Sequence, residues 1–117
     1  MTAVQHIVLL KLRSSCNVSA LMGALAGLRA LIPGILSFSA GANTSAEGLS
    51  RGYTHGFIML FESPAARDAY LPHPEHERVK GLVLAELEEG ASEPVCVVDF
   101  GAQLAAGRGA TQFEATW

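Results

Sequence analysis

The sequence predicts a single α+β domain, and three observations support this fold class. Four short segments carry the β-branched and aliphatic residues typical of strands. Two longer segments repeat apolar residues at helical spacing, and Pro, Gly and Ser residues separate the segments. A chain of 117 residues is long enough to fold around one hydrophobic core.

Residues 4–13 form the first predicted strand, and its nearly continuous hydrophobicity indicates that both of its faces are covered. A turn follows, in which Asn17 or Ser19 can cap the next helix. Residues 19–31 carry a stripe of leucines at helical spacing, which predicts an amphipathic helix packed on the core. Ile32–Pro33–Gly34 ends this helix.

Residues 35–41 alternate as a second strand, with Ile35 on one face and Phe38 on the other. A small, polar connection over 42–52 leads to the third and most hydrophobic strand at 53–62. Alternation in this strand places four side chains on one face: His55, Phe57, Met59 and Phe61.

Ser63–Pro64 predicts the start of a short helix that runs to about Tyr70. The chain then bends at His73 and begins a second helix at Pro74, because proline suits a first helical turn and keeps the preceding residue extended. Residues 95–100 form the fourth strand. Residues 101–117 are an Ala/Gly-rich tail that we expect to be partly disordered or packed on a partner.

The predicted order β-α-β-β-α-β is that of a ferredoxin-like fold with an antiparallel four-stranded sheet in the order 4-1-3-2. We therefore expect one domain over residues 1–100, followed by the tail. In this sheet Cys96 is expected near Cys16, and we expect both cysteines to be reduced thiols.

Composition excludes several classes of function. The net charge is −3 and the eight Lys and Arg residues are scattered, which argues against binding to nucleic acid or to an anionic membrane surface. No apolar run is long enough to span a bilayer, and the first residues lack a charged signal-peptide region, so we expect a cytoplasmic protein. Half of the residues are hydrophobic, which predicts that some apolar surface enters an oligomer interface.

The stretch Tyr70–His76 is the best candidate for chemistry, because the bend presents a phenol and two imidazoles from a rigid corner. Tyr70 and His76 could form an acid–base pair, or a buried hydrogen bond that locks the bend.

The other histidines and Asp99 have separate expected roles. His73 fits a structural hydrogen-bonding role. His6 and His55 lie on strands, where they can line a polar pocket or be satisfied core residues. Asp99 is expected to have a structural role, in which it pairs or caps at the rim of the sheet.

We predict no metal and no cofactor. Four histidines with Glu75, Glu77 or Asp99 could coordinate an ion, but none of these residues shows compact ligand spacing.

The chain resembles the stress-responsive A/B barrel (Dabb) domain family, which includes olivetolic acid cyclase. The resemblance lies in segments spread through residues 4–100: His6–Lys11, Ile32–Gly34 with Gly41, Gly52–His55, Phe61–Ser63, Tyr70–His76 and Asp99–Phe100. It implies a dimeric α/β barrel, which is a homodimer whose two sheets pack face to face.

The resemblance also implies site residues. The cyclase uses a tyrosine and a histidine, matching Tyr70 and His76, for the intramolecular aldol closure of a polyketide thioester. Histidines matching His6, His55 and His73 accompany them, the first two lining the pocket, and we expect these three residues to bind substrate. We add Leu25, which stands where the cyclase has a pocket tyrosine, and Phe57 as substrate-binding residues. The segment from His76 to Asp99 is longer here, which should reshape the pocket.

Two functions follow as hypotheses. The first is a stress-response homodimer with a small apolar pocket in each subunit, which binds a small apolar or carbonyl ligand or acts through its own stability. The second is a polyketide-cyclase-like lyase in which Tyr70 and His76 supply acid and base.

Overall fold

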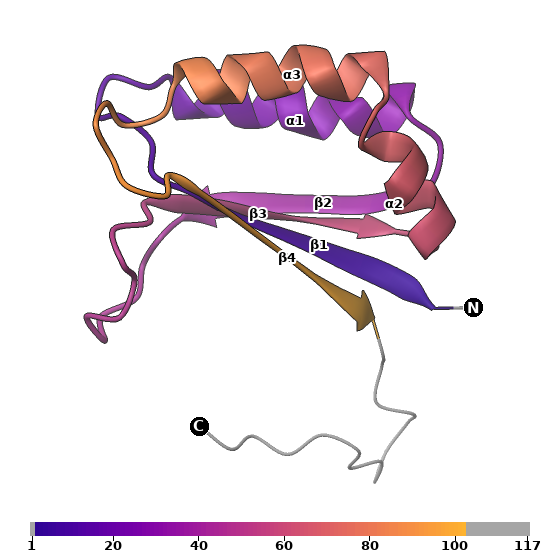
Figure 1. Ribbon diagram of the computed structural model, residues 1–117, viewed down its shortest axis with the longest axis horizontal. Helices are drawn as coiled ribbons and strands as arrows, with labels where there is room; N and C mark the ends of the chain where they lie inside the picture. Colours follow the sequence, from indigo (N-terminus) through magenta and orange to yellow (C-terminus); the bar gives the residue numbers. More distant parts are fainter. Residues whose placement is uncertain (1, 103–117) are drawn as a thin grey trace, which may run out of the picture.

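The computed structural model describes residues 2–102, and its elements follow the predicted order (Figure 1). The strands and helices are β1 (Ala3–Leu10), α1 (Val18–Leu31), β2 (Ile35–Ala42), β3 (His55–Phe61), α2 (Pro64–Tyr70), α3 (Pro74–Ala85) and β4 (Val95–Ala102). The sheet is antiparallel throughout, in the order β2-β3-β1-β4. The ferredoxin-like fold and the strand order are therefore confirmed.

The helices lie on one side of the sheet. In Figure 1, α1 and α3 run next to each other above the strands, and α2 sits at the end of the sheet where β3 finishes. The core fills the space between them, and its most deeply buried side chains come from β1, β3 and all three helices: Leu10, Leu28, Met59, Phe61, Tyr70 and Val79. Within the described residues, no helix lies on the other side of the sheet.

Side-chain caps set the starts of the three helices as the sequence predicts. Asn17 accepts a hydrogen bond from the backbone N–H of Ala20, and Ser63 accepts one from Ala66. Pro74 opens α3 after an extended His73, whose Nδ1 accepts a hydrogen bond from the Glu75 N–H at 3.1 Å. Helix α3 ends at Ala85, because Leu87 instead pairs with Leu12 in an isolated bridge.

One predicted strand face is wrong. The pairing of β2 with β3 shifts between Ile35 and Ser37, so Ile35 and Phe38 both face the helices. A one-residue bulge reverses the alternation, which is why the simple two-residue period misplaced Ile35.

The strand ends also differ from prediction. β1 stops at Leu10, β3 begins only at His55, and β4 extends to Ala102. Thr54 donates its N–H to the Leu10 carbonyl just before β3 starts. The predicted tail beyond Ala102 lies outside the described residues. Within residues 2–102, none of the helices combines the length and apolar character needed to cross a membrane.

The sheet face opposite the helices, which we call the open face, is apolar. It presents side chains from three strands, and four of them are at least 38% exposed: Leu9, Ile58, Val98 and Phe100. In the single chain, β1 is covered on one face only, whereas the sequence predicted cover on both. The uncovered face has the composition of a surface that packs against a partner.

Candidate functional site

A cavity of about 360 Å³ opens on the helix side of the sheet, between β1, β4 and α3. Its wall is mainly apolar and holds four side chains that can exchange protons or carry charge. The lining residues are His6, Val8, Leu10, Leu25, Phe57, Tyr70, Leu71, His76, Lys80, Val83, Leu84, Val95 and Val97. Five of the seven residues expected in the site therefore share one cavity: Tyr70, His76, His6, Leu25 and Phe57.

Tyr70 ends α2 and is only 1% exposed. Its ring packs on Phe61 with centroids 4.9 Å apart. The Tyr70 hydroxyl makes no hydrogen bond to any of residues 2–102. Every fully buried polar side-chain atom in this range has a hydrogen-bond partner, so the Tyr70 hydroxyl must be at least partly accessible. The phenol therefore faces the cavity. Burial raises the pKa of Tyr70 to about 12, which keeps the phenol protonated and able to donate a hydrogen bond.

His76 lies in the first turn of α3, against the Tyr70 ring. The ring centroids are 4.2 Å apart and tilted by 37°, so the two residues meet by ring contact. The His76 Nδ1 lies 2.8 Å from the Leu71 carbonyl oxygen, which can only accept. Nδ1 therefore donates, so that in the neutral form of the imidazole the lone pair lies on Nε2. This tautomer suits a general base.

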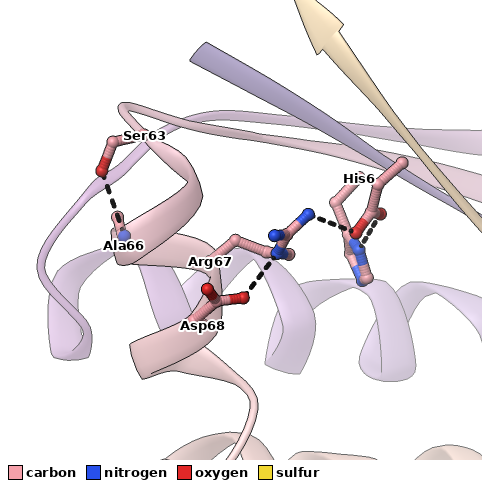
Figure 2. A network of polar contacts seen from close by, with 6 residues as sticks. His6, Ser63, Ala66, Arg67 and Asp68 are labelled. Carbon is pink, nitrogen blue, oxygen red and sulfur yellow. Dashed lines mark hydrogen bonds and ion pairs between the residues drawn. The ribbon is translucent and has the colours of Figure 1, made fainter. Parts of the chain in front are cut away.

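His6 brings a second imidazole to the cavity from β1. It is 5% exposed, and its Nδ1 lies 2.6 Å from Asp99 Oδ1 on the neighbouring strand β4. The other Asp99 oxygen accepts from Arg67 at 3.0 Å. Figure 2 shows that the Arg67 guanidinium is bonded to Asp68 on one side and, on the other, to the carboxylate that contacts His6. Because a carboxylate only accepts, His6 donates from Nδ1, and its Nε2 remains for a ligand.

The remaining two predicted site residues lie elsewhere. His73 caps α3 through its contact with Glu75, and it does not line the cavity. The Nδ1 of His55 lies 2.8 Å from Thr54 Oγ1, and His55 lines a second, wider hollow of about 630 Å³, whose wall includes the open-face residues Leu9 and Ile58. Cys96 lines this hollow too, whereas Cys16 packs against the core on the helix side, and both are free thiols.

Sequence reasoning missed two charged residues. Arg67 forms an ion pair with Asp99. The sequence indicated that Asp99 could pair, but its partner could not be identified before the fold was known. Lys80 lines the cavity one helical turn after His76. The spacing of four residues places them on one helix face, and this signal was available in the sequence. Within residues 2–102, no three His, Cys, Asp or Glu side chains gather as a metal site.

The high pKa of Tyr70 predicts a loss of stability at alkaline pH. The unfolded chain has an ordinary tyrosine pKa near 10, below the value of about 12 in the fold, so it releases the proton first as pH rises. Stability should be unaffected by this group below pH ~10 and should fall by roughly 2–3 kcal/mol as pH rises to ~12. Urea unfolding of the wild type and Tyr70→Phe across this range measures the effect. The variant should lose this component, and identical slopes for both proteins would contradict the assignment.

Comparisons with known proteins agree with the fold. The family model described as Stress Responsive A/B Barrel Domain matches residues 4–101. The stress-response A/B barrel domain-containing protein HS1 of Arabidopsis thaliana is 31% identical over 100 residues, which cover 83% of this chain and 87% of HS1.

Two solved structures are also similar. A dimeric ferredoxin-like protein of unknown function from Jannaschia sp. CCS1 is 34% identical, with a TM-score of 0.72 over 86% of this chain and 99% of that one. A hydroxynitrile lyase from Passiflora edulis has a TM-score of 0.74 over 86% and 94% of the two chains, but at 17% identity this likeness shows the fold alone. The family match over nearly all of the described residues and the identity to HS1 show that this chain belongs to the stress-responsive A/B barrel (Dabb) domain family.

Proposed function

We propose that the protein is a homodimer in which two open faces pack against each other. The support is the apolar character of that face, where Ile58, Val98 and Phe100 are exposed in the single chain. The related Jannaschia protein is described as dimeric. Packing two such sheets would remove their apolar side chains from water, at a gain of about 25 cal/mol per Å².

We also propose that each subunit binds a small, largely apolar molecule in the helix-side cavity. The observation that carries this function is the convergence of Tyr70, His76 and His6 on one apolar hollow. A volume of about 360 Å³ is at the lower end of the range for small-molecule sites, which is roughly 300–1,000 Å³. Polar groups that open onto an apolar cavity fix the orientation of a ligand.

Filling the cavity tests this proposal. Leu25 is buried in α1 and lines the cavity, so Leu25→Trp should occupy space that a ligand needs. We expect binding of decanol, or of a methyl ketone of similar length, to weaken at least about tenfold, as measured by calorimetric titration. The overpacking itself should cost ~1–3 kcal/mol of stability.

Leu21→Trp is the matched control. Leu21 is also buried in α1, one turn earlier, but it does not line the cavity. This variant should carry a similar packing cost and keep wild-type affinity. If the wild type binds neither probe, ligand binding is refuted and a role through the stability of the fold is favoured.

A second candidate function is a lyase that closes a β-polyketide thioester by intramolecular aldol addition. The observation that favours it is that one cavity holds a protonated phenol, Tyr70, and an imidazole, His76, whose Nε2 has no hydrogen-bond partner among residues 2–102. His76 Nε2 would remove a proton from the carbon between two carbonyl groups, and that carbon would attack a distant ketone. Tyr70 would donate its proton to the ketone oxygen as the carbon–carbon bond forms. The imidazolium then returns a proton to the phenolate, so both groups are regenerated.

A further inference from the structure

We propose that Lys80 makes the helix-side cavity selective for an apolar molecule that carries one carboxylate. This inference rests on the proposed ligand binding and specifies the chemical class of the ligand. It assigns a role to a residue that neither the acid–base pair nor the Arg67–Asp99–His6 network uses.

The position of Lys80 is suited to the opening of the cavity. Lys80 lies on α3 one turn after His76, and it lines the same wall. Its side chain is 50% exposed, so part of it contacts solvent while part belongs to the lining. A lysine in this setting buries its hydrocarbon stem against apolar neighbours and keeps the ammonium group at the water boundary. Val83 and Leu84, one turn further along α3, continue the apolar wall.

The described residues that line the helix-side cavity carry a positive charge but no negative charge. This lining includes no Asp or Glu, and Lys80 is its one Lys or Arg. The nearby carboxylate of Asp99 is already engaged by Arg67 and His6. An anionic group that enters the cavity from the α3 side would therefore meet a cation and no opposing acid in the wall.

The present partner of Lys80 can be displaced. Its Nζ lies 3.5 Å from Glu77 Oε2, and both side chains are about half exposed. Ion pairs of this kind are worth only ~0–1 kcal/mol, since water screens them and both chains lose freedom. A carboxylate held by an apolar tail in the cavity would be presented to Lys80 at a high local concentration. The ligand would then place its tail toward Leu25 and Phe57 and its carboxylate at the opening.

Decanoate and decanol form a matched pair of probes, because they share the chain and differ in the charge of the head group. We would titrate both into the full-length wild type and into Lys80→Met at mildly alkaline pH. Met keeps the length and helix preference of the side chain but removes its charge. We expect decanoate binding to weaken about fivefold to tenfold, and decanol binding to change less than about twofold. Raising the salt concentration should reduce only the decanoate affinity.

Two further variants sharpen the test. Glu77→Gln removes the competing carboxylate and should strengthen decanoate binding about twofold. Arg78→Met changes the net charge equally on the same helix, but Arg78 faces Glu75 and does not line the cavity. It should leave both affinities unchanged.

The outcomes separate this inference from the proposal on which it rests. If Lys80→Met weakens both probes equally or weakens neither, the carboxylate selectivity is refuted while the cavity remains a binding site. If Arg78→Met weakens decanoate as much as Lys80→Met, general charge attraction explains the effect and the role of Lys80 is refuted. If neither probe binds the wild type, or if Leu25→Trp leaves binding unchanged, the proposed ligand binding fails and the Lys80 inference fails with it.

Discussion

Ile58→Glu should convert the proposed homodimer into monomers at concentrations where the wild type remains paired. Ile58 lies on β3 in the middle of the open face, with Ile7 of β1 opposite it. In a face-to-face dimer the substitution would bury two carboxylates, one from each subunit. An uncompensated buried charge costs several kcal/mol. We expect the dissociation constant to rise at least about a hundredfold, which corresponds to ~2.7 kcal/mol.

The isolated subunit should tolerate this change. Ile58 is 38% exposed there, so the new glutamate can remain hydrated. Leu82→Glu provides the matched control, because Leu82 is 45% exposed on α3, away from the open face. Sedimentation velocity over a range of concentrations would report the assembly state, and circular dichroism the fold. A wild type that is monomeric throughout, or an Ile58→Glu protein that dimerises normally, would refute pairing through this face.

The sequence predicted the architecture well because each element carries its own periodic signal. Leu21, Leu25 and Leu28 repeat at helical spacing, and α1 buries all three of them. The bulge at Ile35 was not predictable in this way, since one extra residue reverses an alternating pattern without changing its composition. The sequence of β1 is hydrophobic on both sides and predicts cover on both faces, but only one face is covered in the single chain.

The site was less predictable because it depends on strand register. His6 and Asp99 are 93 positions apart, and they meet only because β1 and β4 pair in this register. Register also separates the two strand histidines. His6 pairs with Met59, whereas His55 pairs with Leu10, four residues further along β1. Four strand residues span about 13 Å. His55 and His6 therefore lie too far apart along the sheet to share the helix-side cavity, although they belong to the same face of the sheet.

Tyr70→Phe and His76→Ala should each abolish most of any cyclase activity. Removal of a positioned acid or base typically costs about 10²–10⁴ in rate. The two losses should not add, because both residues act in the same proton transfer. The assay is turnover of linear β-polyketide thioesters, followed by the appearance of the cyclised product. Stability measured in parallel would separate lost chemistry from lost fold, since Tyr70 also packs on Phe61.

The chain supplies a matched control for the phenol. The other tyrosine of the chain, Tyr53, lies outside the helix-side cavity. Its hydroxyl donates a hydrogen bond to the Glu93 carbonyl at 2.9 Å. Tyr53→Phe should retain wild-type turnover. Added imidazole should restore part of the rate of His76→Ala, because it can occupy the vacated space and accept the proton, whereas a purely structural histidine would show no such rescue. Full turnover in both Tyr70→Phe and His76→Ala would exclude the acid–base pair. The cavity would then be left with binding as its function. Among residues 2–102, neither the Tyr70 hydroxyl nor the His76 Nε2 has a hydrogen-bond partner, and both can still orient a carbonyl group that never reacts.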